Sequence, residues 1–516
     1  MNGAQALIRT LVDAGVEVCF ANPGTSEMHF VAALDDVPGM RGVLTLFEGV
    51  ATGAADGWAR MTGRPAATLL HLGPGLGNGL ANLHNARRGG APQVTVVGDH
   101  ARSHKRLDAP LESDVDALAG TVSGWVRRTL APEDVGADAA DAVAAAARGQ
   151  VATLVLPADV SWSDGGVPAA PAPARPRPQV APAVLDDVAA VVQGGEPTVL
   201  LLGGDVVAAE AGLLAAARVA AGTGARLLAE TFPARMVRGA GLPDVGRLPY
   251  PPEVAMKALA GTRHLVLAGA TAPVHFFGYP GVPGTPVPDD CTVHVLAEPG
   301  EDGVAALEAL AGRVAPGAEP ELLEASRPEL PTGRLTPRAA SAVVGALLPE
   351  RAVVVDEAIT SGVGLAELTS GAPRHDWLAL TGGAIGDGLP MAVGAAVACP
   401  DRPVVVLQAD GSAMYTLQAL WTMAREQLDV TVVLYDNGSY AILQGELARV
   451  GASGGGERAG RLLDLGGPAL DFVALAAGMG VPATRAETAE ELADRLRVAL
   501  AEPGPHLVQA VLRPGS

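Results

Sequence analysis

The sequence predicts an α/β protein built from three doubly wound domains, each with a parallel sheet covered by helices on both faces. Its 516 residues exceed what one hydrophobic core usually organises. Short, nearly continuous apolar runs alternate with Ala-rich segments of helical periodicity, which is typical of parallel strands buried on both faces. Hydrophobic residues make up 49% of the chain but aromatic residues only 3%, so small and branched aliphatic side chains must form the cores.

Two proline-rich connectors divide the chain. The first, DGGVPAAPAPARPRPQVAPAV at 164–184, favours an extended polyproline II linker. The second, APGAEPELLEASRPELPTGRLTP at 315–337, is polar and interrupted by prolines. These connectors predict domains at residues 1–165, 185–325 and 335–516.

The expected strands follow one another regularly within each domain. In the first domain they are VEVCFAN, GVLTLFE, AATLLHL, QVTVVGD and VATLVLP. In the second they are TVLLLGG, ARLLAE, HLVLAGA and TVHVLAE, and in the third AVVVDEA, PVVVLQAD, VTVVLYDN and HLVQAVL. Ligands of such sheets bind beyond the carboxyl ends of the strands, so the residues that follow each strand are the first candidates for a site.

Composition and charge exclude several classes of partner. The formal net charge of −20 argues against nucleic acid or an anionic membrane surface as a partner. No apolar run approaches the ~20 residues of a membrane span, and the first residues combine charge with helical periodicity, unlike a signal peptide. Cys19, Cys291 and Cys399 are too isolated for a disulfide framework or a zinc pair. We expect a soluble protein of a reducing compartment, most simply the cytoplasm.

The segment QADGSAMYTLQALWTMAREQLDVTVVLYDNGSY places polar residues at the ends of two successive strands. Asp410 ends the first strand and Asn437 ends the second. Adjacent parallel strands bring these ends together, and with the backbone carbonyl of Ser439 they form an oxygen ligand set suited to Mg²⁺. Gly411 and Ser412 open a helix whose free N–H groups can hold a phosphate.

Each half of this pattern has an ordinary structural explanation, because Asp-Gly and Asn-Gly are common in turns and Asp is a common helix cap. The pair at this separation is more specific. It resembles the motif of thiamine-diphosphate (ThDP) enzymes, Gly-Asp-Gly followed after about two dozen residues by Asn-Asn, although Ala409 and Asp436 replace the first Gly and first Asn. The resemblance implies that Asp410 and Asn437 bind the Mg²⁺ that holds the cofactor diphosphate, with Tyr440 nearby. The charge of Asp436 has no assigned role.

The same resemblance implies a glutamate in the first domain. Glu48 ends the expected strand GVLTLFE and opens a helix of small residues, a position that the helix dipole alone also favours. In ThDP enzymes this buried carboxyl bonds N1′ of the aminopyrimidine and promotes formation of the reactive ylid. The stretches ANPGTSEMHF, which contains Gly24 at the cofactor, and LLHLGPGLGNGLANLHNARRGGAPQVTVVGDH resemble pyrimidine-domain segments of the acetolactate synthase and benzoylformate decarboxylase group.

The stretch TGGAIGDGLPMAVGAAVA resembles the segment that supplies the residue wedging the cofactor into its V shape. By this resemblance Ile385 is the wedge and Gly383 lies at the cofactor. Ordinary packing in the core is the alternative for Ile385. The resemblance therefore covers the whole chain, as pyrimidine-binding, middle and diphosphate-binding domains.

The residues expected to meet the substrate come from the benzoylformate decarboxylase side of the resemblance. Thr25 takes the place of a Ser, and His71 that of a His, in that enzyme. A second His from the middle domain corresponds to His275 or, one position later, to Phe276. The segment LAGATAPVHFFGYPGVPG lacks the arginines with which acetolactate synthases hold FAD, so FAD is unlikely.

The resemblance implies a Mg²⁺- and ThDP-dependent enzyme that decarboxylates a small-molecule 2-keto acid to a cofactor-bound enamine, which is protonated to an aldehyde or ligated to a carbonyl acceptor. It also implies a homodimer as the minimum, with sites between subunits, and a homotetramer as the usual state. An FAD-independent acetolactate synthase acting on pyruvate and a catalytically silent paralogue stay open. A nucleotide-binding oxidoreductase is disfavoured because no complete GxGxxG follows a strand. The sequence leaves the identity of the keto acid open.

Overall fold

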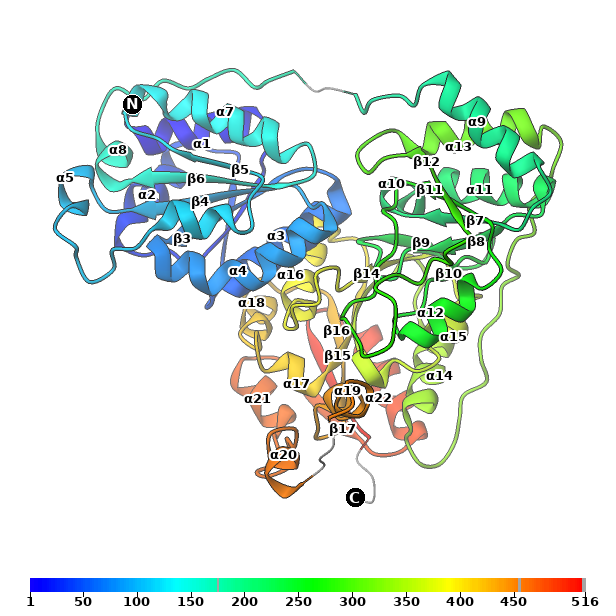
Figure 1. Ribbon diagram of the computed structural model, residues 1–516. Helices are drawn as coiled ribbons and strands as arrows, with labels where there is room; N and C mark the ends of the chain where they lie inside the picture. Colours follow the sequence, from blue (N-terminus) through cyan, green and yellow to red (C-terminus); the bar gives the residue numbers. More distant parts are fainter. Residues whose placement is uncertain (174–175, 453–455, 513–516) are drawn as a thin grey trace.

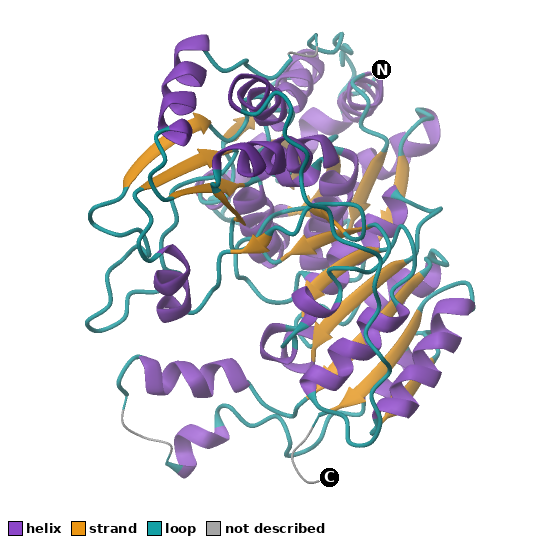
Figure 2. Ribbon diagram, turned by 90° about the vertical axis from the view of Figure 1, so that its right-hand side faces the viewer, coloured by secondary structure: helices purple, strands orange, loops and turns teal. Residues whose placement is uncertain are grey.

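The computed structural model describes residues 1–173, 176–452 and 456–512 and confirms the predicted fold class. Three separate sheets, each dominated by parallel strands, carry helices on their faces. Figure 1 shows the first domain in blue and cyan beside the green middle domain, with the yellow-to-red third domain below both. Figure 2 shows the strands of the sheets as a layer between helices.

The first sheet contains six parallel strands. Its order is β2-β1-β3-β4-β6-β5, with β1 at Val18–Ala21, β2 at Arg41–Leu44, β3 at Ala66–His71, β4 at Gln93–Asp99, β5 at Trp125–Arg128 and β6 at Val151–Pro157. The helices of this domain are α1 (Gly3–Asp13), α2 (Met28–Asp36), α3 (Glu48–Thr62), α4 (Leu72–Gly89), α5 (Arg102–Lys105), α6 (Val115–Gly120), α7 (Val135–Ala146) and α8 (Ala158–Trp162), with short 3-10 turns η1 (Thr25–Glu27) and η2 (Pro132–Asp134).

The middle sheet contains five parallel strands in the order β10-β8-β7-β11-β12. They are β7 (Thr198–Leu202), β8 (Arg226–Ala229), β10 (Gly246–Arg247), β11 (His264–Ala268) and β12 (Thr292–Ala297). Its helices are α9 (Pro182–Gln193), α10 (Gly204–Ala208), α11 (Glu210–Thr223), α12 (Pro252–Leu259) and α13 (Gly303–Val314). The strand order changes direction between β7 and β11, the place where ligands of such sheets usually bind.

The third sheet has seven strands in the order β17-β18-β16-β15-β13-β14-β9. They are β9 (Met236–Arg238), β13 (Val353–Glu357), β14 (His375–Ala379), β15 (Val404–Ala409), β16 (Val430–Asp436), β17 (Ala483–Ala486) and β18 (His506–Val511). Its helices are α14 (Pro337–Leu347), α15 (Leu365–Leu368), α16 (Gly388–Ala398), α17 (Asp410–Ala413), α18 (Ala419–Arg425), α19 (Ala441–Arg449), α20 (Glu457–Arg461), α21 (Phe472–Gly478) and α22 (Ala489–Ala501), with a 3-10 turn η3 (Ile359–Ser361).

Strand β9 departs from the predicted domain plan. It lies in the middle segment of the sequence but pairs antiparallel with β14 of the third sheet, through Met236 opposite Trp377. The sequence did not predict β9, nor the other short strands β5, β10, β14 and β17. Runs of two to five residues carry too little apolar periodicity to indicate a strand, and pairing across the domain border depends on tertiary contact.

Helices α3 and α16 join the first and third domains (Figure 1). A Cβ on Gly57 would lie 2.0 Å from the carbonyl oxygen of Met391, and a Cβ on Gly394 would lie 1.8 Å from that of Ala54. The two backbones therefore approach more closely than any other side chain permits. This contact fixes the first domain against the loop that precedes α16.

No helix in the described part of the chain is both long enough and apolar enough to span a membrane.

Candidate active site

The predicted residues of the first domain gather at the carboxyl edge of its sheet. Gly24 follows β1, His71 ends β3, and Glu48 opens α3. A Cβ on Gly24 would lie 2.3 Å from the imidazole of His71, and a Cβ on Gly75 would lie 3.4 Å from both Oε1 of Glu48 and Cβ of His71. The structure thus brings Gly24, Glu48 and His71 together, with Thr25 exposed at the start of η1.

Glu27 is a buried carboxylate that the sequence analysis did not single out. Its Oε2 lies 2.8 Å from Nδ1 of His71 and accepts the backbone N–H of Gly24 at 2.8 Å. Its Oε1 accepts the hydroxyl of Ser26 at 2.6 Å. A Cβ on Gly98 would lie 1.7 Å from Oε1, so only glycine there leaves space for the carboxylate. A carboxylate on Nδ1 orients the imidazole and leaves Nε2 without that partner.

Glu48 is buried at the first turn of α3, with 7% of its surface exposed. Its Oε2 accepts a hydrogen bond from Nδ2 of Asn78 at 3.0 Å. Its Oε1 faces Gly75, where the absence of a side chain leaves room. One carboxylate oxygen is therefore anchored, and the other has no hydrogen-bond partner among the described residues and is available to a ring nitrogen.

Asp410 and Asn437 of the third domain lie at the ends of adjacent strands, as expected. Strands β15 and β16 pair in parallel with Ala409 opposite Tyr435, so Asp410 and Asn437 both lie just beyond the paired residues. Oδ2 of Asp410 accepts the N–H of Gly438 at 2.7 Å, which ties the two strand ends together. Burial raises the pKa of Asp410 to about 6 because it penalises the charged carboxylate. A cation at this position would offset that penalty.

Asn437 and Ser439 form a tight turn at the same edge. Oδ1 of Asn437 accepts the N–H of Ser439 at 2.9 Å, and the hydroxyl of Ser439 donates to the carbonyl of Leu463 at 3.0 Å. The neighbouring Asp436 is buried and accepts Nε2 of Gln509 on β18 at 2.8 Å. Its carboxylate therefore has a partner within the sheet.

Gly411, Ser412 and Tyr440 surround Asp410. A Cβ on Gly411 would lie 2.6 Å from Cε1 of Tyr440, so the tyrosine ring covers the backbone at the start of α17. The Ser412 hydroxyl donates to the carbonyl of Ala409 at 3.1 Å and accepts Nε2 of Gln408 at 2.6 Å. The hydroxyl of Ser412 is thus engaged locally, and only its backbone N–H fits the phosphate role predicted for it.

A buried carboxylate shapes the loop that carries Ile385. Glu357, at the end of β13, accepts the backbone N–H groups of Gly386 at 2.6 Å and Gly388 at 2.7 Å. Burial raises the pKa of Glu357, and these hydrogen bonds counteract that effect. Ile385 is half-buried immediately before Gly386, and both Gly383 and Gly386 have positive φ angles, at +75° and +95°. The loop therefore holds a left-handed geometry on either side of the predicted wedge.

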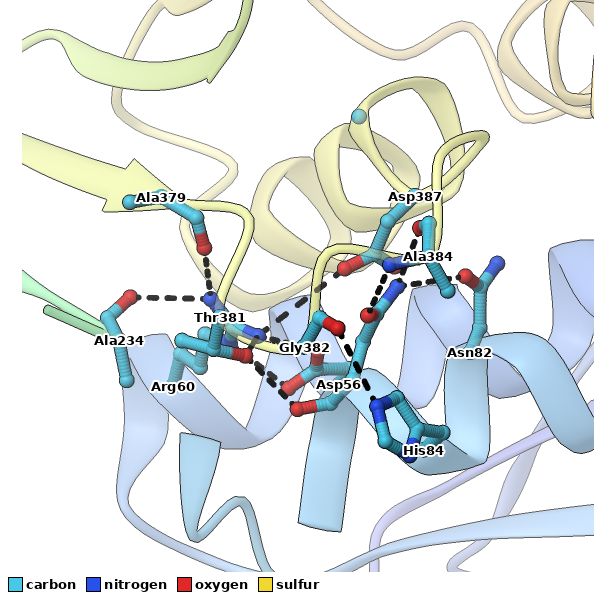
Figure 3. A network of polar contacts seen from close by, with 12 residues as sticks. Asp56, Arg60, Asn82, His84, Ala234, Ala379, Thr381, Gly382, Ala384 and Asp387 are labelled. Atoms are coloured by element: carbon cyan, nitrogen blue, oxygen red, sulfur yellow. Dashed lines mark hydrogen bonds and ion pairs between the residues drawn. The ribbon is translucent and has the colours of Figure 1, made fainter. Parts of the chain in front are cut away.

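Helices α3 and α4 hold this loop from the first domain (Figure 3). Arg60 binds Asp56 through two hydrogen bonds of 2.6 and 2.7 Å, and it also reaches the hydroxyl of Thr381 at 2.9 Å. Asn85 donates to the carbonyl of Ala384 at 2.8 Å. Asn82 bridges the carbonyls of Gly49 and Gly386, which links the residue after Glu48 to the residue after Ile385.

The middle domain presents Phe276 to the same loop. A Cβ on Gly383 would lie 2.3 Å from Cζ of Phe276, so the phenyl ring rests on the loop backbone. His275 is half-buried, and its Nε2 has no hydrogen-bond partner among the described residues. Of the two alternatives that the sequence left open, the geometry puts Phe276 rather than His275 against the wedge loop.

The residues around Glu48 and those around Asp410 fit ThDP and a divalent cation. Glu48 offers a carboxylate oxygen beside a glycine cradle, and Asp410 is a buried carboxylate whose ionised form a cation would stabilise against the cost of burial. The described residues contain no group of three or more His, Cys, Asp or Glu side chains suited to a metal, so the fit depends on one carboxylate with an amide and a carbonyl oxygen. No hydrogen bond among the described residues joins Gly24, Thr25, Glu48 or His71 to the residues around Asp410.

Four functional candidates escaped the sequence analysis: Glu27, Asn78, Asn82 and Glu357. Glu27 lies within ANPGTSEMHF, and its spacing after Gly24 was the only signal available. Asn78, Asn82 and Glu357 act through partners distant in the chain, which a single sequence does not indicate.

Comparison with known proteins agrees with this arrangement. Residues 1–119 match the model "Thiamine pyrophosphate enzyme, N-terminal TPP binding domain", and residues 362–510 match the C-terminal TPP binding domain. "Putative acetolactate synthase large subunit IlvX" of Mycobacterium tuberculosis is 65% identical over 99% of both chains. "Benzoylformate decarboxylase" of Pseudomonas aeruginosa is 32% identical over 96% of both.

A solved structure shares the whole fold. The ThDP-dependent 4-hydroxybenzoylformate decarboxylase of Rhodococcus jostii superposes with a TM-score of 0.87 at 26% identity, covering 100% of both chains. Two family models that together cover more than half of the chain, and a relative at 65% identity, leave one conclusion. The chain belongs to the thiamine-pyrophosphate (ThDP) enzyme family.

Proposed function

We propose that this protein is a Mg²⁺- and ThDP-dependent enzyme that decarboxylates a 2-keto acid and either releases an aldehyde or joins the remaining acyl unit to a carbonyl acceptor. The observation that carries the proposal is that Asp410 and Asn437 lie together at the ends of β15 and β16, which a hydrogen bond from Gly438 to Asp410 joins. The names of the relatives support this reaction class.

In this proposal each group of residues has a defined task. When bound, the cofactor supplies the nucleophile and accepts the electrons left by CO₂. Asp410, Asn437 and the carbonyl of Ser439 hold Mg²⁺ and the diphosphate. Glu48 exchanges a proton with the pyrimidine ring through its free oxygen.

The remaining residues position the cofactor and supply a proton to the substrate. Ile385, with Gly383, supports the bent cofactor. His71, oriented by Glu27, holds or delivers a proton at the substrate oxygen through Nε2. Thr25 adds a hydroxyl at the same edge, and His275, which lines the cavity beside Phe276, has no assigned step in the proposed chemistry.

The proposed cofactor set contains no FAD. The carboxyl of Glu230, just after β8, accepts the N–H of Gly204, just after β7, at 3.2 Å. Burial raises the pKa of Glu230 to about 7. An acid at this position and the absence of arginine from residues 267–284 offer little to a flavin diphosphate.

We also propose a homodimer as the minimal active unit, and a homotetramer as the complete assembly, because the family builds each site from two subunits. The proposed location is the cytoplasm, which agrees with three free cysteines.

Acetolactate synthesis without FAD is the second candidate, favoured by the name of the relative at 65% identity. Product analysis with ThDP and Mg²⁺ separates the candidates. Aldehyde from a 2-keto acid indicates a decarboxylase, and acetolactate from pyruvate indicates the synthase. A protein that binds ThDP but turns over no keto acid would be the silent paralogue.

Binding measurements test the cofactor site itself. Mg²⁺-dependent binding of ThDP, followed by titration calorimetry, should be lost in Asp410→Asn and should persist in Asp436→Asn, whose carboxylate has Gln509 as a partner. Equal loss in both variants, or no binding by the native protein, would contradict the proposed site.

A further inference from the structure

The aromatic residues of this chain are few and unevenly placed. The sequence has seven Phe, five Tyr and five Trp among 516 residues. Five of these rings lie in loops at the carboxyl edge of the middle sheet, after β8, β10 and β11. They are Phe232, Tyr250, Phe276, Phe277 and Tyr279, and we call them the aromatic wall.

The rings of the aromatic wall contact one another edge to face. Phe276 is at the centre, with ring centroids 6.0 Å from Phe232, 5.6 Å from Tyr250 and 5.0 Å from Phe277. Phe277 continues the row to Tyr279 at 6.5 Å. These are favourable geometries for aromatic pairs, so the wall is a preformed surface.

Two rings at the centre of the wall are open to solvent. Phe276 is 42% exposed and Phe277 is 53% exposed, and the adjacent Val274 is 76% exposed. A contiguous exposed apolar patch of this kind marks a binding surface, whereas isolated exposed apolar residues do not. A shallow cavity borders the patch; its lining residues carry no acidic, Lys or Arg side chain, and are Thr231, Phe232, Leu248, Pro249, Tyr250, Ala255, Val274, His275, Phe276 and Pro286.

The wall borders the proposed site directly. Phe276 rests on Gly383, two residues before the predicted wedge Ile385, and only a glycine at that position allows the contact. At its far end, Tyr279 lies under the guanidinium of Arg449 at 5.7 Å. Arg449 belongs to α19, the helix that begins immediately after Tyr440. The wall is thus held between the wedge loop and the helix that follows the proposed metal site.

We infer that the aromatic wall binds the side chain of the 2-keto acid, and that this side chain is an aromatic ring. The inference rests on the proposed function and adds the substrate class to it. A planar aromatic group can cover the exposed surfaces of Phe276 and Phe277. The methyl group of pyruvate is too small and would leave most of that surface in contact with water. The wall has no charge for the substrate carboxylate, which must meet the residues around His71.

The first test measures binding without turnover. Titration calorimetry compares mandelate with lactate, two 2-hydroxy acids that differ in a phenyl and a methyl group, on the full-length protein loaded with ThDP and Mg²⁺. Mandelate should bind at least about ten-fold more tightly than lactate, because contacts between aromatic rings contribute a free energy of about that factor. Phe276→Ala should abolish the difference, and Phe277→Ala should reduce it. Equal affinities in the native protein would overturn the inference.

The control variant is Val498→Ala, which truncates a side chain on α22 that is 55% exposed. It should keep the preference for mandelate. Phe276→Leu keeps an apolar side chain and guards against misfolding of Phe276→Ala. Its preference for mandelate over lactate should fall between that of the native protein and that of Phe276→Ala. A native preference that survives in both Phe276 variants would overturn the inference.

Turnover separates this inference from the proposed function. A lower KM for benzoylformate than for pyruvate, reversed in Phe276→Ala, supports both. Turnover of pyruvate alone, with equal binding of mandelate and lactate, refutes the aromatic substrate and leaves the proposed function intact. Wall-dependent mandelate binding without turnover of any keto acid refutes the proposed function but supports an aromatic ligand. Dissociation of the oligomer in Phe276→Ala, with no mandelate binding by the native protein, would make the wall a subunit interface and overturn the inference.

Discussion

Oε2 of Glu27 lies 2.8 Å from Nδ1 of His71, and the glutamate is buried while the histidine is partly open. The contact joins the loop after β1 to the end of β3, two neighbouring strands of the first sheet. A carboxylate at Nδ1 fixes which nitrogen of the imidazole faces the site. The proton-transfer role proposed for His71 therefore depends on Glu27.

Replacing Glu27 by Gln should lower kcat by about 10- to 100-fold, because a hydrogen bond to a charged group is worth about 1.5–3 kcal/mol. KM and ThDP affinity should change little, since neither the keto acid nor the cofactor touches Glu27 in the proposed site. Steady-state kinetics and calorimetry measure the two effects. Ser26→Ala removes a hydroxyl that donates to Oε1 of Glu27 and lies 3.2 Å from Nδ1 of His71, and it should lower kcat less because the carboxylate stays on Nδ1. Equal effects of the two variants would contradict the positioning role.

Glu48→Gln should reduce turnover by about 10²- to 10⁴-fold, the usual contribution of a positioned acid or base. The carboxyl exchanges a proton in the proposed chemistry, and an amide does not. Hydrogen–deuterium exchange at C2 of bound ThDP, followed by NMR, should slow by a similar factor. Glu17→Gln, which changes an exposed residue paired with Arg64, is the matched control and should leave exchange unchanged. Exchange at the native rate in Glu48→Gln would exclude the proposed role.

Gly394→Ala should destabilise the protein by about 1–3 kcal/mol, because the added Cβ would lie 1.8 Å from the carbonyl of Ala54 and must push α3 and α16 apart. Gly312→Ala in α13 is the control, since no heavy atom lies within 4 Å of its added Cβ. That variant should be stabilised by about 0.5–1 kcal/mol through the higher helix propensity of Ala. Denaturant unfolding followed by circular dichroism gives both values, and a neutral Gly394→Ala would refute the close contact.

Arg60→Met should cost about 3–5 kcal/mol of stability, because it leaves the buried carboxylate of Asp56 without its partner. Asp387→Asn should be nearly neutral. Burial and the neighbouring charge of Asp56 raise the pKa of Asp387 well above its usual range, against the opposing effect of Arg60 4.0 Å away, so an uncharged amide should cost little at this position. Thermal unfolding at pH 7 compares the two variants, and a severe loss in Asp387→Asn would show that Asp387 is ionised.

Stability should fall in mild acid partly through His375. Burial lowers the pKa of this histidine from 6.5 to about 4. As pH falls through 6.5 the unfolded chain binds a proton here and the folded protein does not, so the free energy of unfolding decreases by about 2 kcal/mol between pH 7 and pH 5. His375→Gln should remove that part of the loss. Unfolding midpoints at pH 7 and pH 5 provide the measurement, and an unchanged pH dependence in the variant would contradict it.

The sequence predicted the fold class and the main strands because buried parallel strands leave long apolar runs such as VVVLQA and VTVVLYD. It missed β9 and β14, whose pairing joins the middle segment to the third sheet. It also indicated Asp410 and Asn437, since residues at successive strand ends must share an edge. The domain boundaries and the roles of the site residues stay predictions.

By itself, the sequence determined the three-domain α/β architecture and the placement of Asp410 and Asn437 at successive strand ends, because apolar runs and strand ends are local properties of the chain. The resemblance to ThDP enzymes, and no local pattern, indicated Glu48 and His71. Only the tertiary structure decided which side chains support them. The contact of Glu27 with His71, the hydrogen bonds of Glu357 to the wedge loop and the contact of Phe276 with Gly383 join residues 29 to 107 positions apart. Such contacts depend on how sheets and helices pack, and no short-range pattern records that packing.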